Sequence, residues 1–265
     1  RVRRPPRFKL FPSTTPFRSM RALANTGIEL SCVGLGEMPL SLSTRPNEAQ
    51  AISVVHAAVD AGMTWIDTAD VYCAGHRDIG HGERLVTTAL KAMGDSGKDI
   101  VVATKGGLER PGGNWTVNGH PDHLHSACAA SLRSLETDCI TWYQLHATDP
   151  KVHFTESVGA LARLQEEGKI QHVGLSNVGV AEIQAAREIV NVVSVQNRCN
   201  PFDRDSFNSG VVAFCTRENI AFLPHSPVGG HKGHIRTPED SVLCAVGARH
   251  GISPYQVCIA WLLAL

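Results

Sequence analysis

Short apolar runs alternate with segments of helical spacing through most of the chain. Runs rich in Val, Ile and Trp predict buried strands at 64–67, 100–104, 140–145, 172–176, 192–196 and 220–224. Between these runs apolar residues recur at helical intervals, as Ile52, Val55 and Val59 do. This spacing predicts helices over 48–61, 82–93, 122–135, 155–167, 180–190, 206–218 and 239–250. Such alternation is typical of a parallel sheet with helices outside it.

The first part of the chain predicts one more strand, over 30–36, and a hairpin before it. The hairpin is indicated by a turn at Asn25-Thr26-Gly27 between two short extended pieces. Counting 30–36, the chain has seven strand–helix units, whereas a closed (β/α)8 barrel needs eight. The alternative, an open doubly wound sheet, is disfavoured because "GLGEMPLS" lacks the third glycine of the phosphate-binding pattern G-x-G-x-x-G. We therefore expect an α/β fold, a (β/α)8 TIM barrel whose eighth strand and last helix are missing.

Both ends of the chain depart from the barrel pattern. The first 28 residues hold seven basic residues and no acidic one. We expect residues 1–19 to form a disordered basic tail, with a targeting segment as the alternative. Residues 20–265 are expected to form the barrel domain. Its last stretch, "SPYQVCIAWLLAL", stops inside a predicted apolar helix, so we expect the domain to be incomplete at its C-terminal end.

Composition narrows the classes of partner. The 265 residues are 43% apolar and have a formal net charge of zero, which gives no electrostatic basis for binding nucleic acid or a membrane surface. No apolar run is long enough to predict a membrane span. The eight cysteines form no C-x-x-C pair, and several lie in apolar segments. That usage is typical of a reduced, cytoplasmic protein without disulfides or zinc. The oligomeric state is left open.

Polar residues cluster where the predicted strands end. In barrels of this kind, active sites lie at the carboxyl ends of the strands. The polar residues there, together with Tyr72 in the loop after the strand 64–67, are Asp67, Lys105, His146, Ser176, Asn177, Gln196, Asn197, His225 and Ser226. Each one alone is explained by a turn or a helix cap, so the argument rests on their joint occurrence.

Four of these residues form a set suited to proton transfer. A phenol such as Tyr72 is a poor acid near pH 7, but a nearby ammonium, here Lys105, favours the phenolate and lowers the pKa. Asp67 would hold Lys105 charged and in place, and His146 would orient a substrate oxygen. Such a set is suited to protonating the oxyanion that forms from a carbonyl. Asp70 has no role in it and is interpreted as a loop or helix-cap residue.

Several motifs, in the expected order, resemble those of the aldo-keto reductases, a family of nicotinamide-dependent (β/α)8 barrels. They are "GLG" at 34–36, "DTADVY" at 67–72, "GERLVTTALK" at 82–91, "ATKGG" at 103–107, "ASLRSLETDCITWYQLH" at 130–146, "GKIQHVGLSN" at 168–177 and "VQNRCN" at 195–200. The resemblance implies an NAD(P)H-dependent oxidoreductase that reduces an aldehyde or ketone to an alcohol by hydride transfer. It implies that the catalytic residues are Asp67, Tyr72, Lys105 and His146, with Tyr72 as the proton donor.

The resemblance also implies positions for the cofactor. Ser176, Asn177 and Gln196 match residues that hydrogen-bond the nicotinamide carboxamide. His225 takes the place of an aromatic residue that stacks on the nicotinamide, and its ring offers a smaller face; Ser226 follows it at the same strand end. NADPH is the expected cofactor. NADH is possible, because the family binds the 2′-phosphate with residues after the eighth strand, and this sequence stops before them.

Within the family, three stretches look most like bacterial reductases of the pyridoxal-reductase kind. They are "TKGGLERPGGNW", "QLHATDP" and "FLPHSPVGG". This similarity suggests an aromatic or small aldehyde as the carbonyl substrate. Trp115, in the long loop 106–121, either lines the substrate pocket or packs under its own loop.

Two other functions compete with this interpretation. The first is a catalytically weak scaffold or redox sensor that binds a nucleotide. The second is a metal-dependent TIM-barrel hydrolase, suggested by His120, His123 and His125 near Asp122. Because a helix predicted to start at Pro121 places positions 123 and 125 on different faces, we expect no metal.

Overall fold

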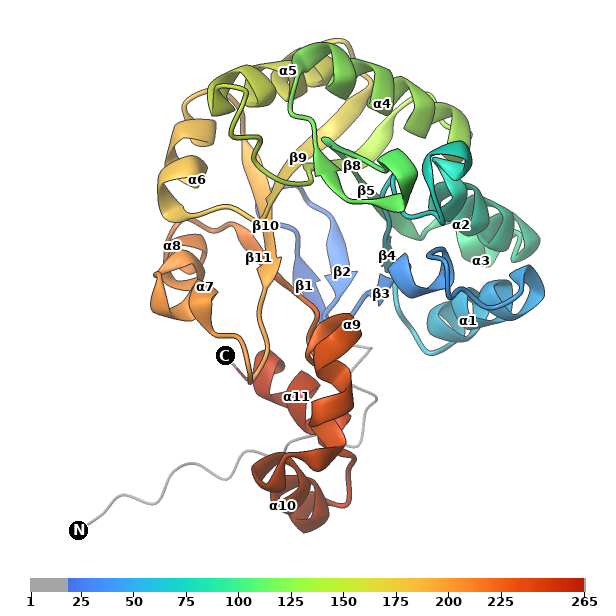
Figure 1. Cartoon of the computed structure of the whole chain (residues 1–265), viewed down its shortest axis with the longest axis vertical. Helices are drawn as coiled ribbons and strands as arrows, with labels where there is room; N and C mark the ends of the chain where they lie inside the picture. The colour runs from blue at the N-terminus through green and yellow to red at the C-terminus, as the bar shows by residue number, and fades with distance from the viewer. Residues whose placement is uncertain (1–18, 265) are drawn as a thin grey trace.

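The computed structural model describes residues 19–264, and its central feature is a curled sheet of parallel strands with helices on its outer side (Figure 1). The sheet holds seven strands in the order β11-β10-β9-β8-β5-β4-β3, each paired in parallel with its neighbour. They are β3 (Leu35–Gly36), β4 (Trp65–Asp67), β5 (Val101–Gly106), β8 (Ile140–Leu145), β9 (Ile170–Ser176), β10 (Val192–Arg198) and β11 (Ala221–His225). This arrangement confirms the predicted α/β barrel class. The expected tail lies, except for Ser19, outside the described residues.

The outer layer follows the predicted alternation of strands and helices. Its helices are α1 (Glu48–Asp60), α2 (His81–Ala92), α3 (Asp95–Lys98), α4 (Pro121–Leu135), α5 (Phe154–Glu166), α6 (Val180–Arg187), α7 (Asp205–Asn208) and α8 (Val211–Arg217). Beyond β11 come α9 (Gly230–Gly233), α10 (Ser241–His250) and α11 (Pro254–Leu263). The single helix predicted over 206–218 is wrong, because Gly210 has a φ of 82° and separates α7 from α8.

The strand predicted over 30–36 is also two elements. Its first residues form β2 (Glu29–Ser31), which pairs antiparallel with β1 (Met20–Ala22) in the predicted hairpin. The chain then turns over Trp65, whose indole nitrogen donates to the Ser31 carbonyl at 2.9 Å. At Gly34 a Cβ atom would lie only 2.1 Å from the Trp65 ring. This close contact breaks the segment before β3 begins.

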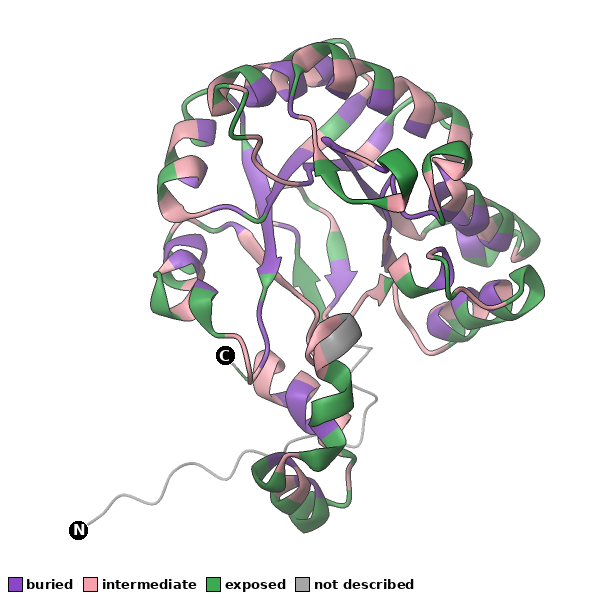
Figure 2. Ribbon diagram, viewed as in Figure 1, coloured by how far each residue is buried: buried purple, intermediate pink, exposed green. Residues whose placement is uncertain are grey.

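Two apolar layers hold the sheet. Between sheet and helices, buried side chains such as Leu124, Leu161 and Val173 form the largest cluster, and in Figure 2 the buried residues lie along the strands and the inner faces of the helices. Inside the arc, Leu23 and Leu30 of the hairpin belong to one buried cluster with Trp142. The hairpin thus fills the amino-terminal end of the barrel and leaves the carboxyl ends of the strands available for a site.

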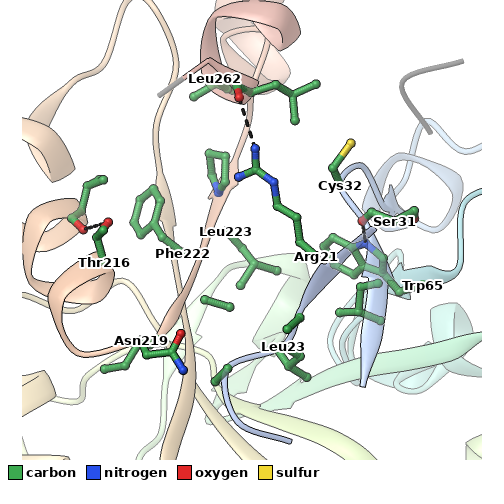
Figure 3. A pocket seen from close by; sticks show the side chains of 18 of the residues that line it. Arg21, Leu23, Ser31, Cys32, Trp65, Thr216, Asn219, Phe222, Leu223 and Leu262 are labelled. Atoms are coloured by element: carbon green, nitrogen blue, oxygen red, sulfur yellow. Dashed lines mark hydrogen bonds between the residues drawn. The ribbon is translucent and has the colours of Figure 1, made fainter. Parts of the chain in front are cut away.

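The barrel is not closed within residues 19–264, because β3 and β11 are the two edges of the sheet and do not pair with each other. A hollow of about 330 Å³ lies between β11, the hairpin and the end of α11 (Figure 3). Arg21 extends across this hollow and donates to the Leu263 carbonyl at 3.3 Å. The seven-stranded sheet is the incomplete barrel that the strand count predicted. No helix of the described part is long and apolar enough to cross a membrane.

Candidate active site

Lys105 connects the predicted catalytic residues at the carboxyl ends of β4 and β5. Its Nζ donates to Asp67 Oδ2 at 2.6 Å, to the Thr68 carbonyl at 2.9 Å and to the Tyr72 hydroxyl at 3.2 Å. The Lys105 side chain is 0% exposed. Three acceptors therefore take the three N–H groups of a buried ammonium, which is the arrangement that makes such burial tolerable.

Asp67 is held by two further donors from across the sheet. Gln196 Nε2 donates to Asp67 Oδ1 at 2.8 Å, and Gln144 Nε2 donates to the same oxygen at 3.1 Å. Gln196 was predicted to contact the cofactor; here its amide nitrogen contacts Asp67. Gln144 was not predicted, although a polar residue inside the apolar run 140–145 was a signal for it. These two donors hold Asp67 Oδ1 in place, while Oδ2 serves as the counter-charge for Lys105.

Burial, more than charge, sets the acidity of Tyr72. Burial raises the pKa of Tyr72 above its usual 10, and Lys105 lowers it by less. For Lys105 itself, burial lowers the pKa, but Asp67 and Tyr72 together raise it by more. The net shift is upward, so the ammonium form is favoured. The sequence-based expectation of a lowered Tyr72 pKa is therefore wrong in its net direction. Tyr72 is a protonated phenol at neutral pH.

His146 follows β8 and lies beside Tyr72. The two rings are 5.7 Å apart at their centroids and meet edge to face at 80°. Burial and the nearby Lys105 lower the pKa of His146 well below its usual 6.5, so the imidazole is neutral at pH 7. Its Nδ1 is buried without a hydrogen-bond partner among residues 19–264. A neutral imidazole there is available to hydrogen-bond a substrate oxygen next to the phenol.

Trp115 borders the same region from the loop between β5 and α4. Its ring meets the Tyr72 ring edge to face, with centroids 6.2 Å apart. At 46% exposed, Trp115 is not packed beneath its own loop. Its position beside Tyr72 supports the first of the two alternatives for this residue, a wall of the substrate pocket.

The residues predicted to hold the nicotinamide form one hydrogen-bonded group at the ends of β9, β10 and β11. Asn177 Nδ2 donates to Ser176 Oγ at 3.1 Å and to the His146 carbonyl at 3.0 Å. His225 lies 3.3 Å from Asn177 Oδ1 through Nε2 and 3.0 Å from Ser226 Oγ through Nδ1. Burial lowers the pKa of His225 to about 4, so its ring is neutral at pH 7.

A second cavity, which the sequence did not predict, lies beyond these residues. It has a volume of about 530 Å³, and Arg198, Arg236 and Gly229 are among its lining residues. Gly229 has a φ of 98°, and a Cβ there would lie 2.6 Å from the backbone of Gly233. Asp203 also lines the cavity, 3.9 Å from Arg198 Nε, so the tight glycine turn and Arg236 are the features that suit an anionic group such as a phosphate. The glycine-rich stretch "SPVGG" after β11 was the sequence signal for it.

Asp70 lies in the loop after β4, as expected from sequence, but its burial was not expected. It is buried, and burial together with the neighbouring Glu83 raises its pKa well above the usual value. Asp70 Oδ1 and Glu83 Oε2 both lack a hydrogen-bond partner within residues 19–264. The carboxyl of Asp70 therefore favours its protonated form and stays outside the proton-transfer set.

The three histidines of the 120–125 segment point to separate partners. His120 caps α4 by accepting from the Asp122 amide at 3.3 Å. His123 lies 3.2 Å from the Leu108 carbonyl, and His125 lies 4.0 Å from Glu167. Side chains held apart in this way do not gather around one point, as metal ligands must.

The sequence and the structure both match known aldo/keto reductases. The Aldo/keto reductase family model matches residues 32–265. "Probable aldo-keto reductase 1" of Glycine max is 31% identical over 270 residues, with 91% of this chain and 76% of that protein covered. The chain belongs to the aldo/keto reductase family, a family of oxidoreductases.

Solved structures agree with this assignment. Aldo-keto reductase AKR11C1 from Bacillus halodurans, in its holo form, is 27% identical with a TM-score of 0.67. The match covers 79% of this chain and 66% of that protein. The thermostable aldo-keto reductase Tm1743, in complex with the inhibitor epalrestat, is 25% identical with a TM-score of 0.74. The match covers 93% of this chain and 85% of that protein. A glycerol dehydrogenase from Gluconobacter oxydans, AKR11B4, shares the fold with a TM-score of 0.77, at 23% identity and coverages of 92% and 83%. The chain thus spans roughly two thirds or more of each.

Proposed function

We propose that this protein is an NADPH-dependent reductase that converts an aldehyde or ketone to an alcohol, with Tyr72 as the proton donor. The observation that carries this proposal is the contact of one buried ammonium, Lys105, with both Asp67 and Tyr72. His146 beside the same phenol completes a site that has an acid, a charge to stabilise its conjugate base, and a neutral imidazole.

The residues of this chain divide the work of the reduction. A bound nicotinamide cofactor supplies the hydride. His146 orients the carbonyl oxygen, and Tyr72 donates its proton to that oxygen as negative charge develops there. Lys105 stabilises the phenolate left on Tyr72, and Asp67 keeps Lys105 charged and in place.

The cofactor would occupy the two adjoining groups of residues at the strand ends. Ser176, Asn177 and Gln196 would bind the nicotinamide carboxamide, and His225 would lie against the nicotinamide ring, with Ser226 beside it. The cavity lined by Gly229, Gly233, Arg198 and Arg236 would hold the phosphates. NADH would supply the same hydride, but we propose NADPH as the cofactor.

The substrate pocket would open above Tyr72 and beside Trp115, which favours an aromatic or small aldehyde, as reductases of the pyridoxal-reductase kind accept. We also propose a cytoplasmic location. Buried cysteine thiols such as Cys73, Cys128 and Cys215 support it.

Two measurements on the purified full chain test this function. Quenching of protein fluorescence by NADPH reports cofactor binding, and loss of NADPH absorbance with 4-nitrobenzaldehyde reports turnover. We expect both. Binding without turnover, for this and several other aldehydes, would favour the alternative of a nucleotide-binding scaffold. Absence of both would reject the reductase.

A further inference from the structure

Arg110 and Trp115 form a stacked pair at the tip of a small hairpin next to the active site. The hairpin consists of β6 (Leu108–Glu109) and β7 (Thr116–Val117), paired as Leu108 with Val117 and Glu109 with Thr116. Continuing this register places Arg110 opposite Trp115. The Arg110 guanidinium carbon lies 3.9 Å from the centroid of the Trp115 ring, which is a close cation–π contact.

Arg110 is buried with most of its donors unused. It is 6% exposed, whereas Trp115 above it is 46% exposed. Arg110 Nη2 donates to the Cys73 carbonyl at 3.3 Å. Within residues 19–264, Nε and Nη1 of Arg110 are buried and have no hydrogen-bond partner.

The neighbouring carboxylates do not neutralise this charge. Glu109 accepts from Asn118 Nδ2 at 2.9 Å and lies 3.5 Å from His123. Asp78 is paired with Arg45 at 2.5 Å. Arginine stays protonated at any physiological pH. A buried guanidinium with unpaired N–H groups is unfavourable unless water or a ligand completes it.

The position of Arg110 relates it directly to the catalytic acid. It donates to Cys73, the residue after Tyr72. The Trp115 ring centroid lies 6.2 Å from the Tyr72 ring centroid and 3.9 Å from the Arg110 guanidinium carbon. The guanidinium carbon is therefore no farther from the Tyr72 ring than these two separations together. One small molecule is able to span that interval.

We propose that Arg110 binds a carboxylate on the carbonyl substrate, so that the preferred substrates are aldehydes that carry an acid group. The inference rests on the proposed function and names its substrate class. One Nη2 hydrogen remains after the bond to Cys73, and it forms a two-pronged donor with either Nε or Nη1. Such a fork matches the two oxygens of a carboxylate. Trp115 covers the guanidinium and provides a flat apolar wall for the substrate body.

The test compares an acid with its neutral ester. For the wild-type chain with NADPH, we expect kcat/KM for 4-carboxybenzaldehyde to exceed that for methyl 4-formylbenzoate about tenfold or more, since charged hydrogen bonds are strong. In Arg110→Gln this ratio should fall to about one. Arg217→Gln is the matched control, because Arg217 also stacks on an aromatic ring, at 4.9 Å from Phe214, but on the outer helix α8. It should keep the wild-type ratio.

A binding measurement separates this inference from the reductase proposal. Calorimetric titration with benzoate, against benzamide as the neutral probe, should show tighter binding of benzoate by the wild-type chain and loss of that difference in Arg110→Gln. The benzoate preference would still support the anion site if no aldehyde were reduced. Equal kcat/KM for acid and ester together with equal binding of benzoate and benzamide would overturn it, even if the ester were reduced well. These wild-type comparisons decide the matter even if Arg110→Gln does not fold.

Discussion

Lys105 Nζ lies 2.6 Å from Asp67 Oδ2, on the strand adjacent to its own, and no part of the Lys105 side chain reaches solvent. The pair is completed by Gln144 and Gln196 on the Asp67 side and by the Thr68 carbonyl on the Lys105 side. A buried ion pair whose remaining hydrogen bonds are all made is tolerated in the protein interior, whereas a single buried charge is strongly destabilising. The same atoms that position Tyr72 therefore also hold the sheet ends together.

Removing one member of this pair should destabilise the fold strongly. Lys105→Met leaves the Asp67 carboxylate with its donors but without its counter-charge, and Asp67→Asn leaves the Lys105 ammonium buried. We expect each to lower the free energy of unfolding in urea by about 3–5 kcal/mol. The double variant should lose less than the sum of the single losses. Lys98→Met, which breaks an exposed pair with Asp95, is the control and should change little; an equally small loss at Lys105 would contradict the structural role.

The rate of reduction should not depend on pH across the neutral range. A proton donor acts below its pKa, and burial raises the pKa of Tyr72 above 10. The pKa of His146 lies well below 6.5 through burial and Lys105, so that imidazole does not change charge above about pH 6. We therefore expect kcat/KM to be level from about pH 6 to about pH 9 and to fall only above pH 10. A falling limb centred near pH 8 would mean that Tyr72 has a lowered pKa.

Glu37 should make the stability of the protein decrease as pH rises toward 7. It is fully buried near Lys105, accepts from Ser41 and Thr68, and burial raises its pKa from 4.5 to about 7. A carboxyl with a raised pKa favours the folded state when protonated, so its contribution is complete below pH 4.5 and is lost as pH rises through 7. Glu37→Gln abolishes this titration.

Thermal and urea unfolding at about pH 4.5 and pH 7.5 measure that effect. Relative to wild type, Glu37→Gln should gain about 3 kcal/mol between the lower and the higher pH. Glu188→Gln, on the exposed end of α6, should show no such change. If Glu37→Gln lost the same stability at both values of pH, folding would not raise the pKa of Glu37.

The strands and helices of the barrel were largely readable from the sequence because burial on both faces of a parallel strand produces continuous apolar runs. The run 140–145 has the same bounds as β8. The failures occurred where a tertiary contact or a glycine overrides local pattern. Trp65 against Gly34 splits the segment 30–36, and Gly210 splits the segment 206–218.

The candidate site was predictable to the extent that its residues lie at the carboxyl ends of buried strands. Asp67 and Lys105 lie in the last residues of β4 and β5, His146 follows β8, and their assembly around Tyr72 needed only the barrel geometry. The burial of Arg110 and Asp70 was missed because burial of a charged residue in a loop leaves no periodic signal. The net pKa of Tyr72 was misjudged for the same reason, since sequence shows the neighbouring charge but not the extent of burial.

The central claim is that Tyr72 gives its proton to the carbonyl oxygen, and single-turnover reduction by Tyr72→Phe tests it most directly. Phenylalanine keeps the ring that contacts His146 and Trp115 but lacks the hydroxyl that accepts from Lys105. With NADPH binding confirmed by fluorescence quenching at wild-type affinity, the account predicts a rate of NADPH oxidation lower by about 100- to 10,000-fold. A Tyr72→Phe variant that binds NADPH and reduces the aldehyde at the wild-type rate would contradict it.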